Sequence, residues 1–364
     1  MKFSAWRLKF RYTNLMATLT SVSYYTRKSV VYGSAGFVSL IILRLIWGVF
    51  SVWWVKNHPP PPPPPTVAFG VLPAIKFPDG KDPKQVSLKL ETITGATPDL
   101  GPQTKVYFMP SYRANVLGLE LATGLAAKLG FLFAPTRVDE QVYEWTREGT
   151  LPGTLSVNLV TGHFRLTTLW HRDAQISTAR APTEAEAVKN AKRFLSSDNL
   201  LDNDLDAGST KVEYLQAGAG VYSSAVSQSD ANFARVHLFR AATEKIPVVT
   251  PNPNEGLVQV VVSGISSQKQ IVEVIYRYSP VEYSRFATYP LRSTKTAWEI
   301  LSSGQGYIPK LIPTQGQTVV RQVKLGYFDN STPQEFLQPV YVFEGDNGFL
   351  GLAPAIDPKW LGKN

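Results

Sequence analysis

Four acidic residues near the middle of the chain have the spacing of a calcium-binding loop. They are Asp202, Asp204, Asp206 and Glu213. Such a loop takes acidic ligands at positions 1, 3 and 5 and a bidentate glutamate at position 12. However, Ala207 stands where the sharp turn requires glycine, and Thr210–Leu215 alternates like a strand rather than an exiting helix. We therefore prefer a polar linker between a helix and a strand, and keep a weak metal site as the alternative.

The histidines have no spacing that indicates catalysis or metal binding. His163 and His171 lie near Trp170 in the sequence, but neither belongs to an H-E-x-x-H motif. The motifs G-x-S-x-G and the P-loop do not occur. The chain has no cysteine, which excludes disulfides, thiolate metal sites and cysteine nucleophiles. We therefore predict no catalytic residue and no cofactor, and interpret the histidines as structural.

One apolar segment, Val30–Val55, determines on which side of a membrane the rest of the chain is expected to lie. It is long enough to cross a bilayer as a helix, which takes roughly 20 apolar residues. Its core, VSLIILRLIWGVFSVWWV, is interrupted only by Arg44. An arginine there costs about 2.5–3.5 kcal/mol on insertion scales, which the apolar neighbours can outweigh. Arg44 is either a tolerated charge that reaches the interface or a contact to a partner helix, and no acid in the span can pair with it.

The charges around this segment predict its orientation. Residues 1–58 hold eight Lys or Arg and no acid, and positive flanks stay in the cytoplasm. The leader is too long for a signal-peptide n-region and no A-x-A-like cleavage site follows, so an uncleaved, single-pass signal anchor is favoured. The remaining chain then lies outside the cytoplasm, in the envelope, with 29 basic and 28 acidic residues. A nearly neutral exported part has no bulk electrostatic reason to bind nucleic acid.

Seven prolines, Pro59–Pro65, follow the segment and predict a polyproline II stalk of roughly 20 Å. A spacer is the preferred interpretation, with a proline-binding partner as the alternative. The chain then divides into a basic cytoplasmic segment, a transmembrane helix, a linker and three exported modules. Their ranges are 1–29, 30–55, 56–66, 67–180, 181–285 and 286–364.

Each expected module combines a helix with antiparallel strands, which indicates an α+β fold of two or three modules. The first helix is expected over about 114–129, with an apolar stripe of Leu117, Leu121, Ala122, Leu125, Ala126 and Leu129. The second begins at a capping box of Thr183 and Glu186, and the third near 294, where Thr296 and Glu299 have the same spacing. Hairpins are expected around 160–163, 264–269 and 346–348.

Several short stretches resemble known families. Thr183–Ala187 and the segment Val157–Phe164, with its Thr161-Gly162 turn, resemble the helix and hairpin of PepSY-like domains. Ala234–Arg240 with Ile246–Val249, and Val323–Phe328 with Leu337–Tyr341, resemble the exported region of YycH/YycI-type proteins. Those are single-span proteins that regulate a cell-wall sensor kinase in low-GC Gram-positive bacteria. The resemblance implies a noncatalytic, regulatory or scaffolding role.

Together these patterns predict a noncatalytic membrane-anchored protein that binds another envelope protein or a wall component. One alternative is an envelope enzyme with an unrecognised site, whose best residues would be His163, His171 and the acids of 202–206. The other is a ligand-sensing module in which the aromatic-rich stretch Tyr276–Tyr289 lines a groove. The 29 residues before the span are too few for an output domain, so such a sensor would signal through a partner.

Overall fold

The computed structural model describes residues 19–58, 63–78, 87–110, 117–266, 269–309 and 317–362. The chain divides into two compact units, Met1–Pro64 and Pro65–Asn364. Residues 1–18, with most of the basic flank, and Pro59–Pro62 of the proline run lie outside the described residues. Pro63–Pro65 form neither helix nor strand.

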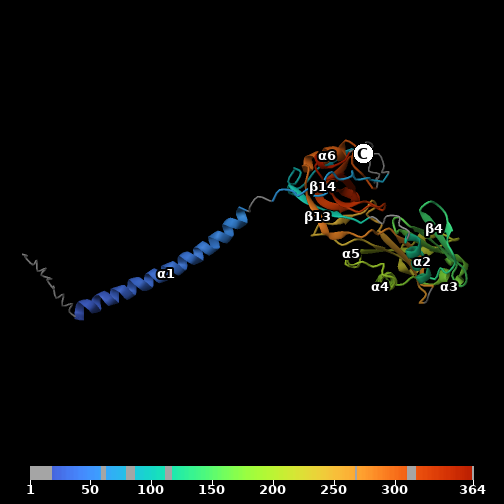
Figure 1. Cartoon of the computed structure of the whole chain (residues 1–364), viewed down its shortest axis with the longest axis horizontal. Helices are drawn as coiled ribbons and strands as arrows, with labels where there is room; N and C mark the ends of the chain where they lie inside the picture. The colour runs from blue at the N-terminus through green and yellow to red at the C-terminus, as the bar shows by residue number, and fades with distance from the viewer. Residues whose placement is uncertain are drawn as a thin grey trace, which may run out of the picture. The chain divides into compact units, whose positions relative to one another are not determined.

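The first unit is built on a single helix, α1 (Leu19–Asn57), drawn in blue in Figure 1. An 18-residue window within it has a mean hydropathy of 2.1, and none of that window is buried. At 1.5 Å per residue the helix is about 58 Å long, more than the roughly 30 Å of a bilayer core. It contains the expected span and begins earlier, so residues 19–29 of the expected cytoplasmic segment are also helical. Its length and apolar character are compatible with a membrane anchor or a signal sequence.

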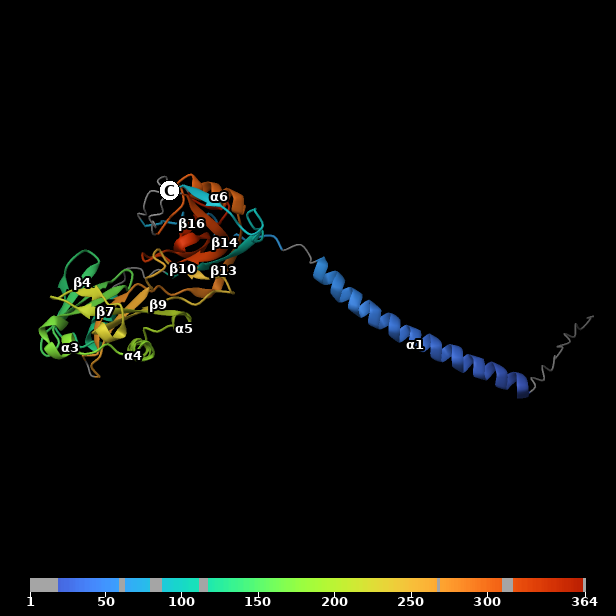
Figure 2. The same ribbon diagram turned by 180° about the vertical axis from the view of Figure 1, so that it is seen from behind.

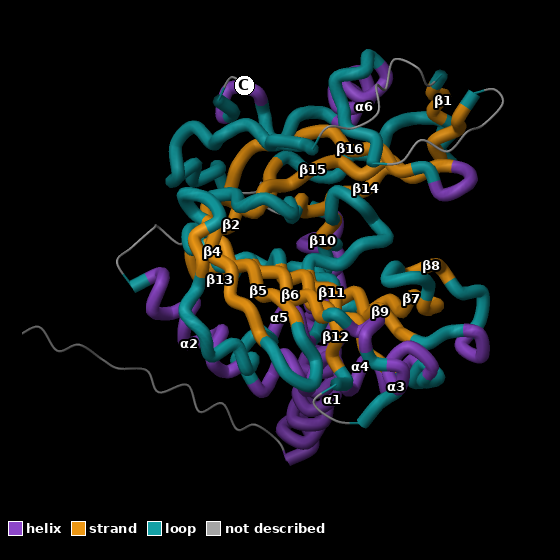
Figure 3. The backbone as a smooth tube through the Cα atoms, turned by 90° about the vertical axis from the view of Figure 1, so that its right-hand side faces the viewer, coloured by secondary structure: helices purple, strands orange, loops and turns teal. Residues whose placement is uncertain are grey.

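The second unit is a mixed α+β fold with two large sheets (Figures 2 and 3). The larger sheet is antiparallel throughout. Its nine strands are, in spatial order, β3 (Thr136–Arg137), β4 (Val142–Arg147), β5 (Gly153–Asn158), β6 (Phe164–Thr168), β12 (Ile271–Tyr276), β11 (Val258–Ser263), β9 (Phe233–Leu238), β7 (Thr210–Ala217) and β8 (Tyr222–Ser224).

The smaller sheet has seven strands and joins segments that are far apart in the sequence. Its main path is β1 (Leu88–Leu90), β14 (Thr318–Phe328), β15 (Phe336–Gly345), β2 (Gln103–Phe108) and β13 (Glu282–Pro290). The short β10 (Val248–Val249) pairs with β14, and β16 (Leu350–Pro354) pairs with β15. The pairs of β1 and β10 with β14 are parallel, and the others are antiparallel.

In the described parts of this unit, five α-helices and several 3-10 turns accompany the sheets. The helices are α2 (Gly118–Lys128), α3 (Ala174–Thr178), α4 (Glu184–Ser197), α5 (Asn203–Asp206) and α6 (Thr294–Ser302). The 3-10 turns are η2 (Trp170–Arg172), η3 (Gln228–Asp230), η4 (Asp346–Gly348) and η5 (Pro358–Trp360). In Figure 3, α2 to α4 lie beside the nine-stranded sheet and α6 beside β14 to β16.

The hydrophobic cores on the two faces of the nine-stranded sheet are formed by alternate residues of its central strands, because successive side chains of a strand point to opposite faces. On β11, Val260 belongs to the cluster that includes Ala187 and Ala191 of α4, whereas Val261 points to the opposite face, towards Trp170 and Ile176. All six residues of β11 are buried, as expected of a strand covered on both faces. Another cluster packs α6, through Ala297 and Leu301, on the seven-stranded sheet.

Several local predictions are confirmed. The Thr183–Glu186 capping box begins α4, with the threonine side chain accepting from the Glu186 amide and the glutamate accepting from the Thr183 amide at 3.0 Å. The three expected hairpins are present as β5–β6, β11–β12 and β15–β16. The turn between β15 and β16 places Asn347 at φ 56° and Gly348 at φ 74°, a region that favours these two residue types.

Two helix predictions need correction. In α2 the buried residues are Ala122, Ala126 and the adjoining Leu129, whereas Leu117 and Leu121 are 55% and 66% exposed. Steps of four residues rotate by about 40° around a helix, so a long stripe turns away from the core. In α6 the cap is Ser293, which accepts from the Thr296 amide at 3.1 Å; Thr296 and Glu299 lie inside the helix.

The expected module boundaries do not separate the sheets. The boundary at 180 divides the nine-stranded sheet, in which β6 pairs with β12 through Leu166 and Val274. The boundary at 285 falls inside β13, whose partner β2 lies in the first expected module. The helices and strands have the expected character, but long-range pairing assembles them into two sheets rather than three modules.

Candidate functional site

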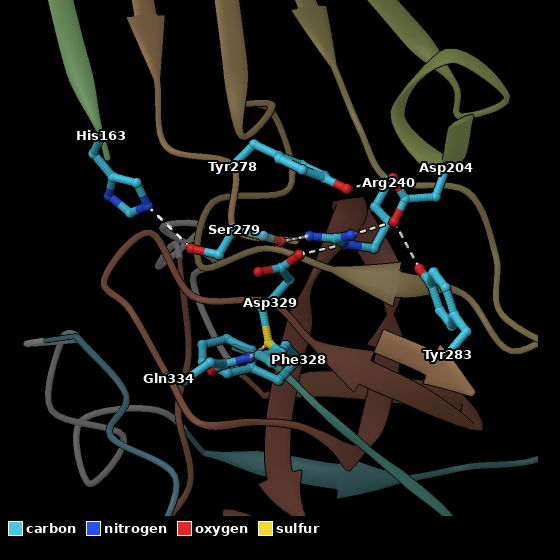
Figure 4. A network of polar contacts seen from close by, with 10 residues as sticks. His163, Asp204, Arg240, Tyr278, Ser279, Tyr283, Phe328, Asp329 and Gln334 are labelled. Carbon is cyan, nitrogen blue, oxygen red and sulfur yellow. Dashed lines mark hydrogen bonds and ion pairs between the residues drawn. The ribbon is translucent and has the colours of Figure 1, made fainter. Parts of the chain in front are cut away.

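A buried group of interacting charges surrounds Arg240, just after β9 (Figure 4). Its side chain is fully buried. The guanidinium donates to Asp329 Oδ2 at 2.7 Å, to Asp204 Oδ2 and to the carbonyl of Ser279 at 2.6 Å. It also lies over the Tyr278 ring, 4.5 Å from its centre. One arginine therefore holds two carboxylates and a loop carbonyl.

The partners of Arg240 come from both sheets. Asp204 lies on α5, Tyr278 and Ser279 follow β12, and Asp329 follows β14 of the seven-stranded sheet. Tyr283 on β13 completes the group, because its hydroxyl donates to Asp204 at 2.7 Å, as does that of Tyr278. Figure 4 shows these side chains converging on the guanidinium. The arrangement ties the end of one sheet to the end of the other.

Burial and charge set the protonation states of this group. Burial alone lowers the pKa of Arg240, but Asp329 and Asp204 raise it well above its usual value, so the guanidinium stays charged. Burial raises the pKa of Asp329 despite the attraction of Arg240, and the nearby charge of Asp204 acts in the same direction as burial. Burial also raises the pKa of Tyr283 to about 12, so its phenol remains a neutral donor at physiological pH.

His163, an expected candidate, lies at the edge of the same network. Its Nε2 is 3.1 Å from the hydroxyl of Ser279, whose carbonyl accepts from Arg240. Burial, with a contribution from the Arg277 charge, lowers the pKa of His163 to about 4. The imidazole is therefore neutral over most of the physiological range.

The Ser279–His163 distance alone would suit a nucleophile and its base. The electrostatics do not suit that chemistry. Taking the hydroxyl proton would create an imidazolium in a partly buried site beside Arg277, which is the state that burial and this charge both disfavour. The geometry instead supports a structural hydrogen bond between the end of the β5–β6 hairpin and the loop after β12.

The other expected candidates do not join this network. His171 is exposed and lies near Gly220. Asp206 pairs with Lys192 at 2.9 Å, and Glu213 lies on β7 beside Arg235 at 3.4 Å. Asp202 precedes α5 as its N-cap residue but makes no side-chain capping bond. Within the described residues no three histidines or acids form a group that could hold a metal ion.

The tyrosines proposed to line a groove are used inside the fold. Tyr276 stacks on Phe164, with ring centres 4.9 Å apart, and donates to the Leu200 carbonyl at 3.1 Å. Tyr289 is fully buried, and its hydroxyl donates to the Gly70 carbonyl at 2.9 Å. With Tyr278 and Tyr283 bound to Asp204, these four tyrosines contribute to packing, whereas Phe286 of the same stretch is 44% exposed.

An open cleft lies elsewhere on the nine-stranded half, along α4. Two adjoining hollows of about 840 and 770 Å³ share Asn190, Arg193 and Gln270. The walls are the C-terminal end of α2, the segment between β4 and β5, the exposed face of α4 and the described residues on either side of the β11–β12 turn. Gly264 of that turn passes so close to the Arg180 carbonyl that a Cβ would lie 1.9 Å from its oxygen.

Sequence reasoning missed both features. Arg240 ends a run of apolar alternation, Ala234–Arg240, and a charge at such a position was a possible signal of a buried ion pair. Its partner Asp329 is 89 residues away, and no local pattern connects the two. The cleft depends on α2, α4 and a hairpin meeting, which is a property of the tertiary structure.

Comparison with known proteins adds little. No family model matches the chain, and no curated protein matches it. Among solved structures, the crystal structure of an uncharacterized protein from Eubacterium rectale ATCC 33656 is similar over 70% of this chain and 82% of that one. The sequence identity is 12% and the TM-score is 0.36, too low to transfer a fold or a function.

Proposed function

We propose that this protein is a noncatalytic, single-pass membrane protein whose α+β unit lies outside the cytoplasm and binds another envelope protein or a wall component. The observation that carries the proposal is α1, an apolar helix whose most apolar window is entirely exposed. Exposed apolar surface of this extent requires lipid or a partner to cover it. The basic flank, with eight Lys or Arg and no acid in residues 1–58, supports a cytoplasmic N-terminus.

The proline run then acts as a spacer between the membrane and the folded unit. The resemblance to YycH/YycI-type proteins supports a regulatory or scaffolding role. The lowered pKa of His163 makes it a weak base towards Ser279, which argues against hydrolysis at this pair. An enzyme that uses Ser279 is the second candidate, because its hydroxyl lies 3.1 Å from His163 Nε2.

The absence of cysteine allows a direct test of topology. Single substitutions Ser4→Cys and Lys295→Cys each introduce one thiol, the second at an exposed site on α6. We expect a membrane-impermeant maleimide to label Lys295→Cys in intact cells and Ser4→Cys only after permeabilisation. The opposite pattern, or recovery of both variants in the soluble fraction, would refute the anchor and its orientation.

Binding and catalysis are separated by two further measurements. We expect photo-crosslinking in intact membranes to give one dominant envelope partner, and the full chain in detergent to show no turnover of ester or peptide substrates. If the chain hydrolyses such a substrate and Ser279→Ala abolishes the activity, the enzyme hypothesis replaces the proposal. Ser302→Ala, a serine on α6 remote from His163 in the sequence, is the matched control.

A further inference from the structure

The cleft along α4 has a charge that differs from the rest of the exported unit. Its basic lining residues are Lys128, Arg147, Arg180, Lys189, Arg193 and Lys269, against the acids Glu148, Glu186 and Asp198. Six basic residues therefore face three acids. The chain beyond residue 58 is nearly balanced, with 29 basic and 28 acidic residues. The excess is thus a local property of the cleft.

The lining charges are not equally available to a ligand. Arg147 donates to the carbonyls of Leu151 and Leu129, and Lys269 pairs with Asp173 at 2.5 Å. These two cations are therefore used to hold the cleft wall together.

Three other cations are exposed and open to the cleft. In the described part of the chain, no carboxylate oxygen lies within 4.0 Å of the charged nitrogens of Arg180, Lys189 or Arg193. Arg193 donates to the Asn190 side chain at 2.5 Å, which orients its guanidinium along the shared part of the cleft. Glu186, the acid on the same helix face, is already bonded to the Thr183 amide and hydroxyl. A net positive surface therefore faces solvent.

The arrangement follows from the sequence of α4. Ala187, Ala191 and Leu195 pack on the sheet, so the opposite face presents Lys189 and Arg193, four residues apart, to the cleft. Arg180 approaches from the segment before the helix, held there by the close passage of Gly264. Charges from two segments thus line the same pair of adjoining hollows.

We propose that this cleft binds a phosphate-bearing polyanion. The inference rests on the proposed binding function and names its ligand chemistry. Arginine side chains present planar forks of donors that match phosphate oxygens. Two adjoining hollows of about 840 and 770 Å³, which share three lining residues, suit an extended chain of anionic groups better than one small anion.

The test uses the full chain in detergent and polyphosphate of defined length, with calorimetric titration at two salt concentrations. We expect binding that weakens as salt rises, because exposed charges are screened. The double substitution Lys189→Glu with Arg193→Glu should weaken binding by about tenfold or more. The matched control is Lys295→Glu with Lys359→Glu, which makes the same charge change at exposed positions elsewhere and should bind as the unaltered chain does.

Further arms identify the source of the phosphate and the outcomes that overturn the proposal. Titration with inorganic phosphate tests a free anion, and vesicles containing phosphatidylglycerol test a lipid headgroup. If the unaltered chain binds either of them and the Lys189→Glu, Arg193→Glu variant does not, phosphate recognition in the cleft is supported. Equal binding of poly-glutamate would show that any acidic chain suffices, as on a protein partner, and would overturn the proposal. Equal loss in both double variants would overturn it too. If no anion binds while labelling and crosslinking succeed, this inference fails and the proposed function stands.

Discussion

The guanidinium of Arg240 and the carboxylate of Asp329 form a buried ion pair, with Nε and Oδ2 2.7 Å apart, across the ends of two different sheets. Arg240 follows β9 of the nine-stranded sheet, and Asp329 follows β14 of the seven-stranded sheet. Both side chains are essentially inaccessible to water. An ion pair in such a place is expensive to break, because each charge that is left alone stays buried.

We therefore expect Arg240→Met to lower the free energy of unfolding by about 3–5 kcal/mol, because Asp329 and Asp204 lose their shared cation. Calorimetric unfolding of the full chain in detergent measures the loss. Adding Asp329→Asn and Asp204→Asn should restore part of the stability, since no unpaired charge then remains. A triple variant less stable than the single one would contradict this explanation.

The pH dependence of stability should report on His163. Its folded pKa lies near 4 and its unfolded pKa near 6.5, so between these values the unfolded chain binds a proton that the folded chain does not. The contribution is complete above pH 6.5 and is lost as the pH falls towards 4, by up to roughly 3 kcal/mol. Burial also lowers the pKa of His237, so the measurement is the difference between the unaltered chain and His163→Gln. A difference that does not change with pH would refute this assignment.

The correction to α2 leads to a paired prediction. Ala126→Leu should lower the free energy of unfolding by about 1–3 kcal/mol, because Ala126 is fully buried and a larger side chain overpacks the core. Leu121→Ser should change it by less than about 0.5 kcal/mol, because Leu121 is 66% exposed. Urea unfolding followed by tryptophan fluorescence compares the two. The opposite ranking would restore the leucine stripe as the packed face.

Arg44 is the one charge in the expected span, and it lies on the exposed surface of α1. Arg44→Leu should preserve membrane insertion, because it removes a cost of about 2.5–3.5 kcal/mol. If Arg44 contacts an acid on a partner helix, the variant should lose most of its crosslinked partner. Leu43→Ala, at a neighbouring exposed position, is the control. Unchanged crosslinking in Arg44→Leu would identify the arginine as a tolerated charge.

The elements that could be predicted from the sequence are those specified by short-range chemistry. The capping box of Thr183 and Glu186, the Asn347-Gly348 turn and the hairpin around 160–163 each depend on neighbours within a few residues. The long apolar helix is of the same kind, since its composition alone identifies it.

What could not be predicted depends on contacts between distant segments. The pairing of β2 with β13, for example Val106 with Ala287, has no local signature, and it invalidates a module boundary at 285. The dependence on contacts between distant segments affected the prediction of the site most. The local sequence places Asp204 in a polar linker, with a weak calcium site as the alternative, whereas its actual partners, Arg240 and Tyr283, are 36 and 79 residues away.

The strand order of the seven-stranded sheet also constrains how the chain acquires its structure during synthesis. Leu88 of β1 pairs with Thr318 of β14, and Tyr107 of β2 pairs with both Phe286 of β13 and Leu337 of β15. The strands β1 and β2 therefore lack these partners until most of the chain has been synthesised. The nine-stranded sheet needs only residues 136–276 and can assemble first. Because contacts of long sequence separation form slowly, completion of the smaller sheet is the expected rate-limiting step and the stage most exposed to aggregation or proteolysis.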